Sequence, residues 1–300
     1  MIDAHIHIFP SYRRIKAIRW IKKYIPGLVI NEAIEETEIL DKLRSLNISY
    51  FFNYIYPLRP EESISLNKYN NQLAKRVKNA ICFGSVHPDN TDRIKIIEEA
   101  IIDFDLIGLK FHPFVQGFKI LDKRMEDVYQ IMQELGRPIV FHTGFEYFYK
   151  AKMSPDEIEL ILKKYPKLVI VISHMFYPHI DKAFHLLEKY ENIYLDGTNI
   201  FSNYRESING ENVFEGMLTK KNGEYYYEVC FNYSIFELEK YSHRIMFGSD
   251  FPVAMNNLDN IYEYIKNIDI SESAKKNILE NTAKNFIRRF KPDFFDERGE

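Results

Sequence analysis

The chain has 300 residues, of which 46% are hydrophobic, so it is long enough to bury a large core. Its 40 basic and 43 acidic residues give a net charge of −3, which offers no electrostatic basis for binding nucleic acid or a membrane surface. The start, MIDAHIHIF, lacks the basic region of a signal peptide, and no run approaches the roughly 18 apolar residues of a membrane span. The two cysteines, Cys82 and Cys230, lie far apart in apolar runs, which is typical of buried, reduced thiols. Because reduced thiols are the rule in the cytosol, we expect a cytoplasmic protein.

Short apolar runs alternate with longer segments of helical periodicity. In chain order, the apolar runs predict strands over 2–9, 48–56, 80–87, 105–112, 137–144, 167–175, 192–199 and 244–252. The periodic segments predict helices over 12–25, 35–46, 61–79, 91–103, 122–136, 154–165, 181–190, 260–267 and 271–290. Ser154 followed by Pro155 is typical of a helix start, and Gly136 of a helix end.

Eight strand–helix units in 300 residues predict an α/β fold, a (β/α)8 TIM barrel of parallel strands, spanning 1–300 as a single domain. Near-continuous apolar strands such as KLVIVI suit a parallel sheet that is covered on both faces. A doubly wound open sheet is the alternative, but no glycine-rich phosphate turn follows the first strand. Long loops follow strands 1 and 7, over 10–34 and 200–243, and NGEYYYEV in the second predicts turns and a short hairpin.

The first strand carries two histidines one residue apart, His5 and His7. Alternate residues of a strand share a face, so these imidazoles project together, with Ile6 and Ile8 on the opposite face. This arrangement can form half of a metal site. Because such a pair also arises by chance, it needs supporting context elsewhere in the chain.

That context comes from polar residues at the ends of other apolar strands. In a parallel barrel all carboxyl ends of strands lie on one face, where the active site is built. The polar residues at predicted strand ends are His5, His7, Lys110, His112, His142, His174 and Asp250. Their convergence favours a functional site over isolated structural histidines.

These motifs resemble the amidohydrolase superfamily, and within it the amidohydrolase 2 branch that includes aminocarboxymuconate-semialdehyde decarboxylase. The similar segments are DAHIHIF, GLKFHPF, IVFHTG, VISHM, RIMFGSDFP and ILENTAKNF, in the family's order and across nearly the whole chain. The resemblance implies four ligands for a divalent metal: His5, His7, His142 and Asp250.

The resemblance also implies catalytic roles for Asp250 and His174, with His174 acting beside the metal or binding a second ion. Lys110 matches a lysine that is carboxylated and bridges two metals in dihydroorotase-like relatives. We expect instead an uncarboxylated, charged Lys110 that holds a substrate carboxylate or pairs with a carboxylate of the barrel floor. A neutral lysine, with a pKa lowered by burial and by the metal, is the remaining alternative. His112 shares the face of Lys110 and receives no transferred role, so Lys110, His112 and His174 are candidates for a second metal or the substrate.

Three imidazoles and a carboxylate suit zinc, and also manganese, iron or cobalt. Such an ion lowers the pKa of bound water towards about 7, and Asp250 can accept the water's proton. We therefore predict metal-dependent hydrolysis of a C–N or C–O bond in a small-molecule substrate. Non-oxidative decarboxylation of a small carboxylic acid at the same site is the first alternative, and a non-catalytic metal-binding protein is the second. Assembly into a homo-oligomer stays open.

Other polar residues carry weaker expectations. The long loops contain Tyr12, Arg13, Arg14 and Arg205. An arginine there could clamp a substrate carboxylate, although a solvated loop charge is the more common role. His87 ends strand 3 and is expected to pack more often than to line a pocket. The remaining histidines, expected to be structural or exposed, are His179, His185 and His243.

Overall fold

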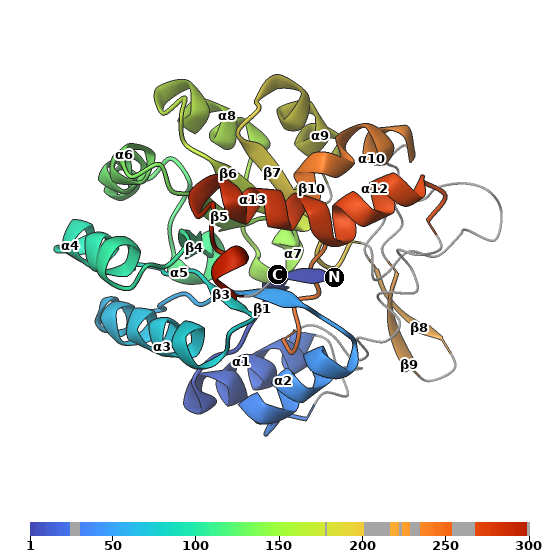
Figure 1. Cartoon of the computed structure of the whole chain (residues 1–300), viewed down its shortest axis with the longest axis horizontal. Helices are drawn as coiled ribbons and strands as arrows, with labels where there is room; N and C mark the ends of the chain where they lie inside the picture. The colour runs from blue at the N-terminus through green and yellow to red at the C-terminus, as the bar shows by residue number, and fades with distance from the viewer. Residues whose placement is uncertain are drawn as a thin grey trace.

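The computed structural model describes residues 1–24, 31–177, 179–200, 217–221, 224–228, 235–253 and 268–298. Within these residues, eight parallel strands surround a central axis, with helices around them (Figure 1). The barrel strands are β1 (Ile2–Ile6), β2 (Tyr50–Asn53), β3 (Ala80–Cys82), β4 (Leu109–Phe111), β5 (Ile139–His142), β6 (Ile170–Ser173), β7 (Ile193–Asp196) and β10 (Ile245–Met246).

Two parallel ladders close into one barrel. Strands β1-β2-β3 form the first and β10-β7-β6-β5-β4 the second. A bridge between Gly84 and Leu109 joins β3 to β4, and a bridge between Ile6 and Phe251 joins β1 to the segment after β10. The predicted (β/α)8 barrel is therefore confirmed, and each strand is shorter than its apolar run because the run continues into buried residues beyond the ladder.

Helices follow the strands as the periodic segments predict. They are α1 (Ser11–Tyr24), α2 (Glu36–Ser45), α3 (Ser63–Arg76), α4 (Arg93–Glu98), α5 (Pro113–Gln116), α6 (Glu126–Glu134), α7 (Glu146–Tyr149), α8 (Pro155–Lys164), α9 (Ile180–Lys189), α10 (Ile235–Tyr241), α12 (Glu272–Lys276) and α13 (Thr282–Phe290). None of these described helices is long and apolar enough to cross a membrane. Ser154 caps α8 by accepting a hydrogen bond from the Asp156 amide at 3.2 Å. The helix expected over 260–267 lies outside the described residues.

The long connection after β7 contains the expected hairpin. Strands β8 (Met217–Lys221) and β9 (Glu224–Glu228) pair in antiparallel register. The connection after β1 holds two helices, α1 and α2.

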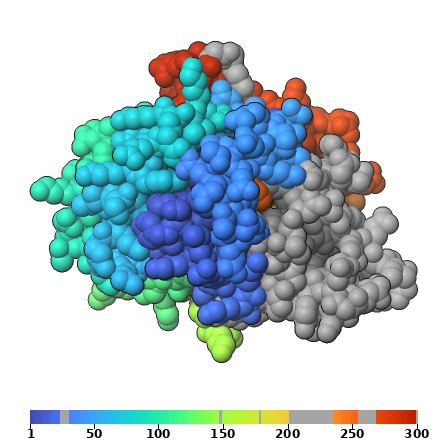
Figure 2. Space-filling view, turned by 90° about the horizontal axis from the view of Figure 1, so that it is seen from below, coloured from blue at the N-terminus to red at the C-terminus, as the bar shows by residue number. Residues whose placement is uncertain are grey.

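The core has two layers separated by the strands. Outward-facing residues such as Ile6, Phe111 and Ile172 pack against the surrounding helices. Inward-facing residues pack with Phe286 of α13, which lies across the end of the barrel that holds the N-terminus (Figure 1). In Figure 2 the C-terminal residues lie at one end of the molecule and a yellow-green segment, near position 150 on the colour bar, projects at the other. That opposite end, at the carboxyl ends of the strands, is where the predicted site residues lie.

Candidate metal centre

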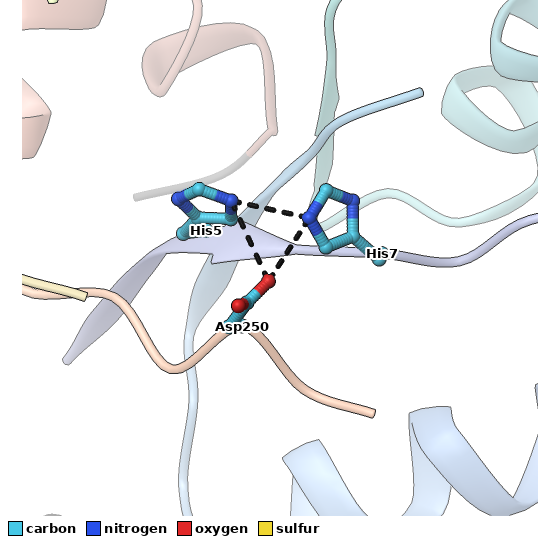
Figure 3. Close-up of side chains that lie close together, drawn as sticks. All are labelled: His5, His7 and Asp250. Carbon is cyan, nitrogen blue, oxygen red and sulfur yellow. Dashed lines mark hydrogen bonds and ion pairs between the residues drawn. The ribbon is translucent and has the colours of Figure 1, made fainter. Parts of the chain in front are cut away.

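Three of the predicted metal ligands form one buried cluster, His5, His7 and Asp250 (Figure 3). The two histidine Nε2 atoms are 3.2 Å apart. The Asp250 Oδ1 atom lies 3.0 Å from Nε2 of His7 and 3.7 Å from Nε2 of His5. All three potential ligand atoms lie within 4.8 Å of one another, which brings strand β1 and the segment after β10 to one point.

A β-bulge in β1 sets this geometry. Asp3 pairs with Phe51 and Ile6 with Asn53, so three steps along β1 match two along β2. The extra residue interrupts the alternation of side chains between the two faces of the strand, so Ala4 and His5 both face the barrel interior. As expected, the histidine pair faces inward, opposite Ile6 and Ile8 in the outer core, but alternation alone does not predict the bulge.

The buried carboxylate of Asp3 supports the bulge. Its Oδ1 accepts hydrogen bonds from the backbone amides of His5 at 3.1 Å and Ser249 at 3.0 Å. Burial raises the pKa of Asp3 to about 7. The Asp250 amide in turn donates to the His5 carbonyl at 2.8 Å. These bonds fix the two strand ends that carry the cluster relative to each other.

Hydrogen bonds donated by Nδ1 leave the Nε2 atoms of the pair available as ligands. His7 Nδ1 lies 2.8 Å from the Tyr54 carbonyl, and His5 Nδ1 lies 2.5 Å from Oδ2 of Asp196. Carbonyl and carboxylate oxygens only accept, so we infer that each Nδ1 carries the hydrogen and each Nε2 keeps its lone pair. Two imidazole lone pairs and a carboxylate oxygen facing one point fit a divalent metal.

His142 and His174 lie beside this cluster rather than within it. His142 Nδ1 is 3.1 Å from His174 Nε2, and the His5 and His174 ring centroids are 5.2 Å apart. The His174 Nδ1 donates to the Thr198 carbonyl at 3.1 Å, which directs its Nε2 towards the site. The Nε2 of His142 is buried without a partner among the described residues. The fourth ligand predicted, His142, therefore neighbours the three-residue cluster, and its role stays a prediction.

Burial controls the charge of these groups. It lowers the pKa of His5 and of His142 well below the ordinary histidine value, so both are neutral and able to ligate at neutral pH. Burial raises the pKa of the Asp250 carboxyl, but its close contacts with the imidazoles of His7 and His5 outweigh burial and lower that pKa. The site therefore presents neutral imidazoles at His5 and His142 and an ionised carboxylate at Asp250.

A sequence profile described as Amidohydrolase matches residues 2–289. The chain belongs to the amidohydrolase family. The family expected from the motifs is thus confirmed, and with it that the chain is an enzyme of a family that depends on divalent metals. Comparison of the sequence with curated proteins finds no match.

Solved structures of low sequence identity share this amidohydrolase fold. An uncharacterised TIM-barrel protein from Bordetella bronchiseptica superimposes with a TM-score of 0.68 at 16% identity, over 97% of this chain and 100% of that chain. A 5-carboxyvanillate decarboxylase from Novosphingobium aromaticivorans, complexed with manganese, gives 0.61 at 14% identity, over 96% and 95%. A 4-oxalomesaconate hydratase from Rhodopseudomonas palustris gives 0.58 at 15% identity, over 100% and 98%.

Lys110 of this amidohydrolase is buried below the histidines. Its Nζ donates to Ser173 Oγ at 2.8 Å and lies 4.7 Å from the centre of the Tyr54 ring. Burial lowers the pKa of Lys110 to about 7, against the opposing charges of Asp196 and Asp250. No carboxylate of the described residues forms an ion pair with Lys110, so the expected pairing with a carboxylate of the barrel floor is not found there, and its neighbours are a hydroxyl and an aromatic ring.

His112 joins the site through aromatic contacts. Its ring stacks on His142 with centroids 3.6 Å apart and an angle of 11° between planes. Its Nε2 lies 3.2 Å from the Tyr149 hydroxyl, and Tyr149 stacks on both Phe114 and Trp20. The amidohydrolase site thus has an aromatic wall built from α1, α5 and α7, which no motif in the sequence predicted.

The loop arginines of this amidohydrolase have structural partners. Arg13 contacts Glu62 at 3.1 Å, and Arg14 donates to the carbonyls of Phe9 and Ile34 at 2.9 and 2.6 Å. Both are buried in α1 and hold it against the barrel, so neither is the solvated loop charge expected as the more common role. Arg205 lies outside the described residues.

The histidines outside the site behave as expected. His87 is buried, and its Nδ1 accepts from the Asp89 amide at 3.2 Å. His185 and His243 are exposed, and His179 is half-buried next to α9.

Proposed function

We propose that this amidohydrolase is a zinc-dependent hydrolase that cleaves a C–N or C–O bond in a small molecule. The observation that carries the proposal is the buried cluster of His5, His7 and Asp250, in which both Nε2 atoms and a carboxylate oxygen face one point. His142 completes the ligand set. A bound divalent ion would supply Lewis acidity and a water of lowered pKa.

Asp250 is the general base of the proposed reaction. Asn199 Nδ2 donates to its Oδ2 at 2.9 Å, which leaves Oδ1 directed at the histidine pair. The lowered pKa keeps the carboxylate ionised and ready to accept a proton from water and deliver it to the leaving group.

His174 orients the substrate or water. Its Nδ1 is fixed on the Thr198 carbonyl, so its Nε2 points to the space beside His142. A neutral imidazole with its hydrogen on Nδ1 can accept a hydrogen from water at Nε2 and so hold that water beside the substrate. Lys110, as an uncarboxylated amine, adds a hydrogen-bond donor and positive potential beneath the histidines.

Decarboxylation of a small carboxylic acid is the second candidate, and the aromatic wall favours it. His7 stacks on Phe9 with centroids 5.2 Å apart and planes at 9°, and Tyr149 stacks on Phe114 with centroids 4.7 Å apart. Flat rings suit a planar, conjugated substrate. The decarboxylases that share this fold act on 5-carboxyvanillate and 2,6-dihydroxybenzoate, which are acids of that kind.

One set of assays tests both proposals. The metal-stripped protein is loaded in turn with zinc, manganese, iron or cobalt and assayed against amides, lactones and aromatic carboxylic acids. Release of an amine or alcohol supports hydrolysis, and release of CO2 supports decarboxylation. If the zinc-loaded protein is inactive while another metal restores turnover, the assignment of zinc is wrong.

The cellular location is proposed on the thiol chemistry. Cys82 is free and buried, and burial raises the pKa of its thiol to about 12, so it is an unreactive reduced cysteine. This agrees with a cytoplasmic protein, which labelling of the chain in cells would test.

A further inference from the structure

A four-residue segment at the end of β7 contacts three residues of the proposed metal centre. We call residues 196–199, with the sequence DGTN, the β7 clip. Asp196 contacts His5, the Thr198 carbonyl accepts from His174, and Asn199 donates to Asp250.

Both oxygens of Asp196 are engaged. Oδ2 lies 2.5 Å from His5 Nδ1, and Oδ1 accepts from the Thr198 amide at 2.9 Å and from the Thr198 hydroxyl. The Asp196 and His5 side chains are fully buried. Because the two Thr198 donors hold one oxygen in place, the other oxygen has a fixed direction towards Nδ1 of His5.

The β7 clip fits closely against the segment that carries Asp250. A Cβ atom at Gly248 would lie 2.7 Å from His5 Cβ, 3.0 Å from Asp196 Oδ1, and would overlap the Thr198 hydroxyl. Only glycine permits this approach of β10 to the clip. The clip therefore lies between β6, β1 and the end of β10, at the point where their three site residues meet.

We propose that Asp196 is a positioning residue that fixes His5 as the tautomer with hydrogen on Nδ1, and that the β7 clip thereby presents Nε2 to the metal. The inference rests on the proposed metal site. The chemistry is general: a carboxylate behind a ligating imidazole selects its tautomer, fixes its orientation and raises its basicity, and its loss costs about 10- to 100-fold in metal affinity.

Asp196→Asn provides the sharpest test because it preserves shape but reverses one hydrogen bond. The backbone amide of Thr198 must still find an acceptor, so the new amide directs its oxygen to Thr198 and its NH2 group to His5. Nδ1 of His5 must then accept, which moves the ring hydrogen to Nε2 and blocks ligation.

Two readouts follow the change. Long-range ¹H–¹⁵N NMR of the metal-stripped protein should show hydrogen on Nδ1 of His5 in the wild type and on Nε2 in the variant. Chelator competition with zinc should show a loss of affinity of about 10- to 100-fold. Asp3→Asn is the matched control: Asp3 is equally buried but accepts from backbone amides, so the His5 tautomer should not change.

An unchanged His5 tautomer in Asp196→Asn, with zinc affinity within twofold of wild type, would overturn the inference. If the wild type binds no zinc while the tautomer still changes, the metal proposal fails and the positioning role of Asp196 stands. If Asp196→Asn does not fold, Thr198→Val removes only the hydroxyl bond to the carboxylate. It should keep the tautomer and weaken zinc binding about two- to tenfold, the range of one hydrogen bond; unchanged affinity would contradict the clip.

Discussion

Replacing Lys110 by Met tests the buried amine at the bottom of the site. The Nζ atom is fully buried and its polar contact is the Ser173 hydroxyl at 2.8 Å. Burial lowers the pKa of Lys110 from 10.5 to about 7. This difference of about 3.5 pH units corresponds to about 5 kcal/mol between the charged and neutral forms. Methionine has a similar length and carries no charge.

The sign of the pH dependence follows from proton binding. Between pH 7 and 10.5 the unfolded chain holds a proton on Lys110 that the folded chain has released. The free energy of unfolding of the wild type should therefore rise with pH, relative to Lys110→Met, by about 1.4 kcal/mol per pH unit in this window. Below pH 7 both states hold the proton and the difference should be constant.

Urea denaturation of the metal-stripped proteins from pH 6 to pH 10 measures this difference. Lys68→Met, which removes an exposed lysine of α3, controls for the substitution itself. A wild-type minus Lys110→Met difference that stays flat from pH 7 to pH 10 would refute a buried free amine. Carboxylation of Lys110 would then be the alternative, visible by ¹³C NMR after exchange with labelled bicarbonate.

Three further predictions concern the site and one helix. His142→Ala should lose bound zinc on elemental analysis, and full retention would remove His142 from the ligand set. His174→Ala should lower kcat by about 100-fold or more, the usual size of an acid–base contribution, while keeping its metal; loss of metal would indicate a second ion. Ser154→Ala should lower the free energy of unfolding by about 1 kcal/mol in urea titrations, because it removes the cap of α8; an unchanged value would contradict that role.

Local patterns were sufficient to predict the barrel and the gathering of His5, His7 and Asp250 at one end of it. Polar residues that interrupt apolar strands are costly to bury without a purpose, so His5, His142 and Asp250 stand out in a single sequence. Parallel strands then bring their carboxyl ends together, whatever the details of packing. The period of two in β1 also predicted that His5 and His7 face the same side.

What the sequence could not show depends on contacts between distant residues. The hydrogen bond between His5 and Asp196 joins positions 191 residues apart. In the sequence, YLDGTN resembles the end of an ordinary strand. Its role becomes visible only in the folded barrel, where β10 alone separates β7 from β1. The bulge at Asp3 is likewise visible only once β1 is paired with β2. The stack of Trp20 on Tyr149 joins α1 to α7, two helices far apart in the sequence, and no motif links them.

The most direct test of the metal centre is anomalous scattering from crystals of the protein grown with zinc. The account predicts one ion, bound by Nε2 of His5, Nε2 of His7, a carboxylate oxygen of Asp250 and a ring nitrogen of His142. An ion bound elsewhere, with His5, His7 and Asp250 still in contact with one another and without metal, would contradict it.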